Sequence, residues 1–289
     1  MSQSAPPDRA AFFAAPDAEV AAVAPATVVY AAGGTRRVAA QAGIALDEAY
    51  IAYTRAQLVE NLALFFRLGV QHVIVPCLGP RQLVEAAPYG ERIIDWCIEA
   101  LTGPEMVADY RRLGWRARFI APSPLPALQE ATARLERELT DPNQPTAWYY
   151  LVADDSDPWT HLFAAVHRSG ARTYGEALRA VYGEEVPPAT LFVGFGKLVT
   201  GTTLVPPLLC APNMQCYWGQ RAGLRLTEPM LRAIFYDYAY ARRTWRADRR
   251  FRYEQPAEQH ALWETTEIIG VGTAHNGFWY PAAFPGPQE

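Results

Sequence analysis

The sequence predicts an α/β fold with one domain, in which a mostly parallel central sheet is flanked by helices. Short apolar runs without polar alternation recur along the chain, as is typical of strands buried on both faces. Segments with helical patterns separate these runs, and helices are the usual connections between parallel strands. Because 289 residues without an internal repeat fit one large domain, we assign residues 1–25 to an N-terminal tail or a loosely docked helix, and residues 26–289 to a single domain.

The predicted strands are apolar segments bounded by turn-forming residues. They cover 26–32, 70–77, 117–121, 148–153, 191–195 and a shorter run at 215–218.

The predicted helices begin and end at recognisable signals. Gly69 favours the end of the helix that precedes it, and Pro124 favours the start of the helix that follows it. Thr227, with Glu228 in the first turn, marks the start of the last long helix. The predicted helices cover about 47–68, 80–100, 104–113, 124–139, a stretch that begins after residue 157, and 227–243.

Composition excludes several classes of function. The formal net charge is −4 and the pI is about 5.8, so the chain lacks the basic character of nucleic-acid-binding proteins. The sequence shows no signal-peptide pattern at its start, and no apolar run is long enough to cross a bilayer. The four cysteines form no CxxC pair, which favours a reduced, cytoplasmic protein. Aromatic residues make up 12% of the chain, which suits a well-filled core or a pocket with aromatic walls.

The most informative segment is Gly33-Gly34-Thr35-Arg36-Arg37, which follows the first predicted strand. Open parallel sheets bind ligands at the carboxyl ends of their strands. Two glycines let the backbone approach an anion, and N–H groups of the turn and the helix start can point at it. Adjacent guanidinium groups add forked donors that fit phosphate oxygens. The motif therefore fits a diphosphate site, although a tight turn with two solvated arginines explains the same spacing.

This motif and several later segments resemble the cis-prenyltransferases and, within that fold, the tuberculosinol synthase group of diterpene synthases. The shared segments keep the same order between about residues 28 and 281. They are GTRR at 34–37, the helix at 47–68, HVIVP at 72–76, YGEEV at 182–186, VGFGK at 193–197, the helix segment at 230–242 and GVGTAHNGFWY at 270–280. The resemblance implies a catalytic domain of the cis-prenyltransferase type, a prenyl diphosphate substrate and a homodimer.

The resemblance also implies roles for individual residues. Tyr50 and Tyr89 would be catalytic, because their rings could hold an ionising carbon and their hydroxyl groups could position a water or take a proton. The residues expected to bind the diphosphate are Gly33, Gly34, Thr35, Arg36 and Arg37, of which the two arginines are also expected to assist catalysis. Further candidates for the pocket are Tyr53, His275 and Trp279.

Two departures from the family pattern bear on metal binding. The family has an aspartate at the head of the motif, where this chain has Gly33, and a late glutamate for which Gln215 is the nearest candidate. Without both carboxylates the protein lacks the oxygen ligands that Mg²⁺ prefers. We therefore expect no metal held by protein carboxylates, so that Mg²⁺ would enter only on the substrate diphosphate. Departure of the diphosphate would then depend on arginines and N–H groups.

A third departure concerns the reaction. Elongating relatives bind a second diphosphate with an arginine-rich segment, whereas Lys197 is the only basic residue of the corresponding segment 194–201. Chain elongation is therefore disfavoured. The leading prediction is a terpene synthase that ionises a C20 allylic diphosphate, linear or already bicyclic, and quenches the carbocation with water or by proton loss. The alternatives are transfer of the prenyl group to a nucleoside or other small acceptor, and a non-catalytic subunit that binds prenyl diphosphates.

Other polar clusters have simpler interpretations. The aspartates of segment 154–157 precede Pro158 and fit the charged N-terminus of a helix better than a metal site. The arginines of segment 242–250 fit a solvated helix end or a partner surface. His161 and His167 have no third ligand near them in the sequence, so we predict no metal site there.

Overall fold

The centre of the computed structural model is a six-stranded parallel sheet with strand order β3-β4-β2-β1-β5-β6. Strand β1 lies between β2 and β5, so that Val29 pairs with both Ile74 and Phe192. The strands are β1 (Thr27–Ala31), β2 (His72–Leu78), β3 (Arg116–Ile120), β4 (Thr146–Leu151), β5 (Ala189–Phe195) and β6 (Cys210–Gly219). The structure describes residues 7–85, 89–123, 125–139, 141–195, 199–219, 223–241, 272–275 and 278–281. The sheet confirms the predicted fold class.

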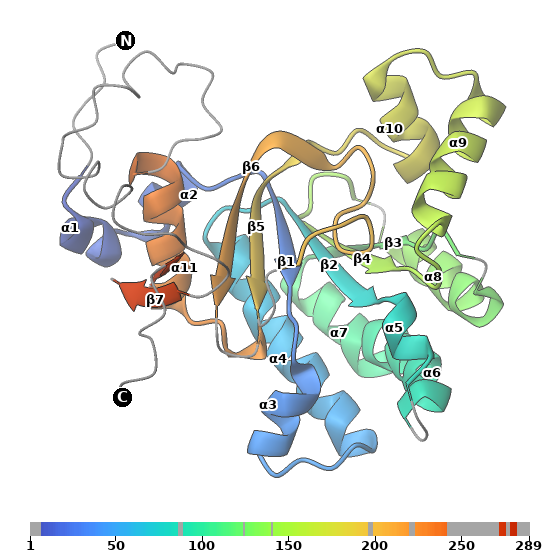
Figure 1. Ribbon diagram of the computed structural model, residues 1–289, viewed down its shortest axis with the longest axis horizontal. Coiled ribbons are helices and arrows are strands. Elements are labelled where there is room, and N and C mark those ends of the chain that lie inside the picture. Colours follow the sequence, from blue (N-terminus) through green and yellow to red (C-terminus); the bar gives the residue numbers. More distant parts are fainter. Residues whose placement is uncertain are drawn as a thin grey trace, which may run out of the picture.

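Figure 1 shows the sheet with its flanking helices, and buried side chains form a core on each face of the sheet. Alternate side chains of a strand point to opposite faces. Val28 and Tyr30 therefore belong to the larger core, together with residues of α4, α6 and α11, while Val29 belongs to the smaller core with residues of α10. The helices are α1 (Arg9–Ala14), α2 (Asp17–Ala21), α3 (Thr35–Gln41), α4 (Glu48–Arg67), α5 (Pro80–Leu83), α6 (Tyr89–Thr102), α7 (Pro104–Leu113), α8 (Pro126–Glu138), α9 (Asp157–Ser169), α10 (Tyr174–Tyr182) and α11 (Glu228–Tyr236).

Burial on both faces explains why the strands read as continuous apolar runs. All six residues of β4 are buried, and Trp148, Tyr149 and Tyr150 are among the largest side chains in the interior. Among the described helices, none combines the length and the apolar character needed to span a bilayer.

Several elements differ from the sequence prediction. The predicted helix at 80–100 divides into α5 and α6, and α11 ends at Tyr236, after which Asp237–Ala241 form a wider π-helical turn. The predicted short strand at 215–218 is the end of β6, which has ten residues. Pro212 conceals the first half of this strand in the sequence, because proline is tolerated only where no ladder hydrogen bond is needed, as on an edge strand.

Helix α10 is absent from the sequence prediction, although both of its ends carry clear signals. The Thr173 side chain accepts a hydrogen bond from the Glu176 N–H, and the Glu176 carboxylate accepts one from the Thr173 N–H at 3.1 Å. Gly183 ends the helix with a φ of 80°, a conformation that glycine adopts without strain. A capping box and a C-terminal glycine therefore mark this helix.

Strands β7 (Gly272–His275) and β8 (Phe278–Pro281) form a separate antiparallel pair. In this pair His275 lies opposite Phe278, and Ala274 lies opposite Trp279.

The N-terminal segment, predicted as a tail or a loosely docked helix, contains α1 and α2. Phe12 of α1 and Val20 of α2 are buried in the larger core. The ring of Phe12 contacts Tyr236 of α11, with ring centroids 5.5 Å apart. Residues 7–25 therefore pack against the last described helix of the domain.

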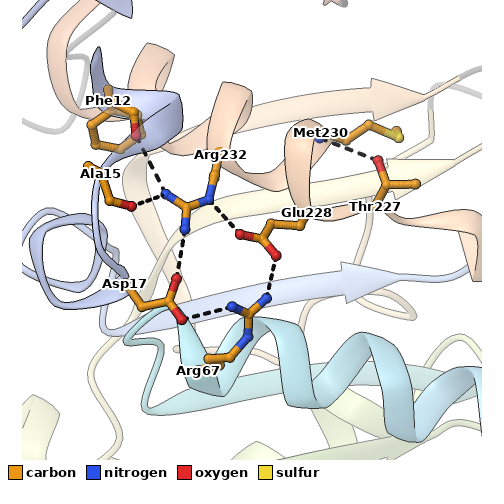
Figure 2. A network of polar contacts seen from close by, with 8 residues as sticks. All are labelled: Phe12, Ala15, Asp17, Arg67, Thr227, Glu228, Met230 and Arg232. Atoms are coloured by element: carbon orange, nitrogen blue, oxygen red, sulfur yellow. Dashed lines mark hydrogen bonds and ion pairs between the residues drawn. The ribbon is translucent and has the colours of Figure 1, made fainter. Parts of the chain in front are cut away.

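A ring of two arginines and two carboxylates fastens this segment (Figure 2). The buried Arg232 of α11 donates to Asp17 Oδ1 and Glu228 Oε1, each at 2.7 Å, and to the Ala15 carbonyl at 2.9 Å. Arg67 of α4 closes the ring by donating to Asp17 at 2.7 Å and to Glu228 at 2.5 Å. The ring thus joins α2, α4 and α11.

The ring makes stability depend on pH. Hydrogen bonds from Arg67 and Arg232 hold the pKa of Glu228 below its ordinary value of 4.5. The stabilisation that this carboxylate contributes is therefore present above pH 4.5 and is lost as the pH falls through the lower pKa of the folded state.

Replacing Arg232 with alanine is expected to lower the free energy of unfolding by about 2–3 kcal/mol. The change removes a buried guanidinium and leaves the Ala15 carbonyl and two carboxylates without this donor. Urea denaturation followed by circular dichroism measures the effect.

Arg67→Ala is the matched control, because the Arg67 side chain is 47% exposed and binds the same two carboxylates. We expect it to cost less than about 1 kcal/mol. Equal losses in the two variants would show that burial of Arg232 does not matter.

Candidate active site

A cavity of about 400 Å³ lies at the carboxyl edge of the sheet, beside the turn that follows β1. Its walls come from that turn, from the ends of β2, β5 and β6, and from facing sides of α4 and α6. Open parallel sheets bind their ligands at this edge. Of the predicted site residues, those that line the cavity are Gly33, Gly34, Thr35, Tyr50 and Tyr89.

The turn at Gly33 and Gly34 depends on the absence of side chains. Gly34 has a φ of 83°, in the left-handed region that favours glycine. A Cβ atom added at Gly33 would lie 2.8 Å from the carbonyl oxygen of Phe195, at the end of β5. The aspartate of the family pattern would therefore displace backbone here, and the structure gives a steric reason for Gly33.

Buried hydrogen bonds hold the turn against the core. The Gly223 N–H donates to the Gly33 carbonyl at 2.8 Å. The Tyr30 hydroxyl donates to the Gly223 carbonyl and accepts a hydrogen bond of 2.8 Å from the Asn61 amide. Burial raises the pKa of Tyr30, so its hydroxyl keeps the proton that it donates. The floor of the turn is thus fixed from α4 and from residue 223.

Arg36 does not itself line the cavity, but it contacts Tyr89, which does, and it already has an anionic partner. Its Nη2 donates to Glu85 Oε1 at 2.6 Å, and its Nη1 donates to Glu85 Oε2, which makes a bidentate ion pair. The guanidinium also lies over the ring of Tyr89, 4.1 Å from the ring centroid. The hydrogen bond that Arg36 donates to Glu85 is the main cause that raises the pKa of Arg36. Neighbouring Arg37 is exposed and does not line the cavity.

The tyrosines at this end of the cavity belong to one aromatic cluster. The hydroxyl groups of Tyr50 and Thr35 share a hydrogen bond of 2.8 Å, which joins the tyrosine to the glycine turn. Trp96 lies between the two tyrosines, with ring centroids 5.7 Å from Tyr50 and 5.8 Å from Tyr89. Gln82 donates to the Tyr89 hydroxyl at 3.3 Å.

Burial sets the ionisation of these phenols. It raises the pKa of Tyr50 to about 12, and it raises the pKa of Tyr89 as well. Both side chains are therefore neutral near pH 7. They can donate a hydrogen bond or present an electron-rich ring face, whereas the phenolate form is disfavoured.

Of the remaining pocket candidates, Tyr53 lies away from the cavity. Tyr53 is half-buried against the core and does not line the cavity. At about 100° per residue, the cavity side of α4 carries Tyr50, Ile51 and Thr54, and position 53 points away from it. The backbones of His275 and Trp279 belong to β7 and β8.

Sequence reasoning missed two residues of this region, Trp96 and Glu85. Trp96 follows Tyr89 and Ile93 on one side of α6, at the spacing of a helical stripe that faces the cavity. That spacing could have identified it. No local pattern marks Glu85, which meets Arg36 across 49 positions of the sequence.

The donor set near the cavity does not fit a metal held by protein carboxylates. Gly33 has no side-chain ligand atom, and the Glu85 carboxylate is paired with Arg36. Gln215 is buried within β6, opposite Leu191 at the start of the β5 pairing rather than at the carboxyl edge. Among the described residues, no group of three histidine, cysteine, aspartate or glutamate side chains could bind a metal ion.

The aspartates after β4 form a helix start, as predicted. Asp157 is the first residue of α9, and its Oδ2 accepts a hydrogen bond from the Asp154 N–H at 3.2 Å. Asp154 in turn accepts hydrogen bonds from the N–H and hydroxyl of Ser156. The arginine-rich segment 242–250 and Lys197 lie outside the described residues.

Comparison with known proteins identifies the family. The chain is 39% identical to (+)-kolavelool synthase of Herpetosiphon aurantiacus over 277 residues, which is 95% of this chain and 96% of that protein. The chain belongs to the kolavelool synthase family of diterpene synthases. Tuberculosinyl adenosine transferase of Mycobacterium tuberculosis is 30% identical to this chain over 120 residues, which is 37% of each protein. No family profile matches the chain.

Two solved structures share the fold of this chain. Lavandulyl diphosphate synthase from Lavandula x intermedia, in complex with dimethylallyl diphosphate, has a TM-score of 0.56 at 16% identity, covering 74% of this chain and 96% of that chain. A probable undecaprenyl diphosphate synthase from Campylobacter jejuni has a TM-score of 0.53 at 11% identity, covering 76% of this chain and 96% of that chain. These structures confirm the predicted cis-prenyltransferase-like fold, and the match to (+)-kolavelool synthase confirms the resemblance to diterpene synthases.

Restoring the family aspartate by Gly33→Asp is expected to destabilise the protein by about 1–3 kcal/mol and to lower activity. The new Cβ would meet the Phe195 carbonyl oxygen, and backbone cannot move aside as a flexible side chain can. Urea denaturation and product formation with and without Mg²⁺ measure the two effects.

Gly201→Asp provides the control, because a Cβ at Gly201 meets nothing within 4 Å. It should match the wild type in both measurements. A stable Gly33→Asp protein that gains Mg²⁺-dependent activity would contradict the steric argument.

Proposed function

We propose that this enzyme ionises a C20 allylic prenyl diphosphate, linear or bicyclic, and quenches the carbocation with water or by proton loss. The observation that carries the proposal is the division of the cavity. One end holds the glycine turn and Tyr89, whose ring contacts Arg36, and the remainder is lined mostly by aromatic and aliphatic side chains. These two parts match the head group and the hydrocarbon of a prenyl diphosphate. Kinship with (+)-kolavelool synthase across 95% of the chain supports the reaction class.

In the proposed reaction the diphosphate binds against the turn at residues 33–35 and the guanidinium of Arg36. Negative charge grows on the leaving oxygens as the allylic C–O bond breaks. Fixed charged donors stabilise that charge more in the transition state than in the ground state, which accelerates the step. The cation–π contact with Tyr89 keeps the Arg36 fork in place for this role.

The aromatic cluster would hold the resulting cation. Tyr50, Tyr89 and Trp96 surround the space next to the glycine turn, where the allylic carbon would lie. Their ring faces attract positive charge, and the neutral hydroxyl groups of the tyrosines can position one water. Apolar walls farther in, including Leu58 and Leu101, would exclude other water from the cation.

Mg²⁺ has no set of protein carboxylates here, so in this proposal it would reach the site only on the diphosphate oxygens. The protein's own contribution to diphosphate departure is then arginine and N–H donors. Loss of activity with EDTA and its return with Mg²⁺ would contradict departure without a metal.

The proposal is tested by product analysis with the purified full chain. Geranyl, farnesyl, geranylgeranyl and bicyclic C20 allylic diphosphates are each incubated with the enzyme, and extracts are analysed by gas chromatography and mass spectrometry. A diterpene alcohol or hydrocarbon formed from a C20 substrate without an added acceptor is expected. Turnover only with a nucleoside or another acceptor would indicate a transferase, and tight binding without turnover would indicate a non-catalytic subunit.

The thiols and the fold support a cytoplasmic homodimer. All four cysteines are unpaired, and Cys77 and Cys97 line the cavity as thiols. Burial raises the pKa of Cys97 to about 12, which keeps it protonated and unreactive. Light scattering of the purified chain tests the dimer directly.

A further inference from the structure

The ion pair between Arg36 and Glu85 places a protein carboxylate where the proposed substrate needs its guanidinium. Both Nη atoms of Arg36 donate to the carboxylate, so the two ends of the fork are in use. A phosphate oxygen pair would approach the same two donors, because a carboxylate and a phosphate present similar spacing to an arginine fork. Glu85 therefore occupies the position that a diphosphate would take.

The position of Glu85 is built into the fold. Its carbonyl oxygen lies so close to Gly90 of α6 that a Cβ atom there would be 2.1 Å away. The same loop is fastened upstream, where the Gln82 amide accepts from the Gly79 N–H at 2.7 Å and donates to the Tyr89 hydroxyl. The loop thus presents Glu85 to Arg36 from a fixed place.

Arg36 does not depend on Glu85 alone for its orientation. Its guanidinium also lies 4.1 Å from the ring centroid of Tyr89, a contact that does not involve the carboxylate. The side chains of Arg36 and Glu85 are 41% and 33% exposed, so the pair is weak enough for a multivalent anion to break.

We propose that Glu85 competes with the diphosphate for Arg36. Glu85 must leave Arg36 before the substrate diphosphate can bind there, and its return helps to displace the inorganic diphosphate after turnover. The inference rests on the proposed function. Each ligand that uses Arg36 must break the Arg36–Glu85 pair, so its affinity falls by the free energy of that pair. After the C–O bond breaks, return of Glu85 to Arg36 favours release of the inorganic diphosphate.

The competing interpretation is that Glu85 only positions Arg36. The two roles predict opposite results for Glu85→Gln, which keeps the size of the side chain and removes its charge. A competitor, once neutralised, lets diphosphate bind more tightly, whereas loss of a positioning group weakens binding.

The test is isothermal titration calorimetry of the full chain with inorganic diphosphate. Glu85→Gln is expected to lower the Kd by about two- to fivefold, from the strength of a partly exposed bidentate pair. Inhibition of turnover by inorganic diphosphate should strengthen by the same factor. An unchanged or higher Kd in Glu85→Gln would overturn the inference, and Glu85→Ala provides a second variant in case the glutamine variant does not fold.

Two further variants separate the possible failures. Glu91→Gln removes the same charge from an exposed position in the first turn of α6 and should leave the Kd unchanged, so a matching decrease there would show only a general charge effect. Arg36→Gln should weaken diphosphate binding. If Arg36→Gln bound diphosphate as tightly as the wild type, the proposed function itself would be contradicted. If Arg36→Gln bound weakly but Glu85→Gln bound no more tightly than the wild type, only the role of Glu85 would be contradicted.

Discussion

Replacement of Arg36 by glutamine is expected to lower kcat/KM for the prenyl diphosphate by about two to three orders of magnitude. The change removes a charged, forked donor that contacts Tyr89 of the cavity lining and leaves a neutral amide. Because charge grows on the diphosphate during ionisation, the loss should fall on kcat as well as on KM. Steady-state assays of released inorganic diphosphate measure both constants.

Arg111→Gln is the control for this prediction. Arg111 is exposed on α7, where it pairs with Glu138, and it lies outside the cavity lining. Its kinetics should stay within about twofold of the wild type. If Arg36→Gln were equally mild, the diphosphate would have to bind through other groups.

Replacement of Trp96 by leucine is expected to lower kcat by about thirtyfold or more. A desolvated cation–π contact contributes about 2 kcal/mol, and this interaction exists only while the substrate carries positive charge. KM should change less than kcat, because the uncharged hydrocarbon keeps an apolar neighbour. Product analysis is expected to show altered ratios of alcohol to hydrocarbon as well.

Trp96→Phe separates the ring from the bulk of the side chain. Phenylalanine keeps a π face and should retain most of the activity, whereas leucine keeps the apolar character and loses the face. Trp159→Leu controls for the general effect of the change, since Trp159 is 45% exposed on α9. Equal rates for the leucine and phenylalanine variants at position 96 would contradict a role for the indole ring.

The predictable part of the fold follows from burial. Strands β1, β2, β4 and β5 are buried on both faces, so each appears in the sequence as a continuous apolar run. β6 escaped in part because Pro212 interrupts its apolar character on an edge strand. The place of the glycine turn also followed from local sequence, because it comes directly after a parallel strand.

Residues of the candidate site could be predicted only from a local motif or from the family resemblance. Tyr50 and Tyr89 meet at the cavity because α4 and α6 pack side by side, and only the resemblance predicted them as site residues. Tyr53 is the same type of residue as Tyr50 and lies only three positions after it, but the rotation of α4 turns it away from the cavity.

By itself the sequence determined a parallel α/β architecture, a glycine and arginine turn at the carboxyl edge of the sheet, and the absence of the family aspartate at position 33. Only the tertiary structure decided which side chains contact one another at the site. It pairs Arg36 with Glu85, leaves Arg37 exposed, places Trp96 between two tyrosines and shows why a side chain at Gly33 would meet Phe195. The reason is physical: strand burial and turn formation depend on neighbours along the chain, whereas these contacts depend on how distant helices and loops pack around one cavity.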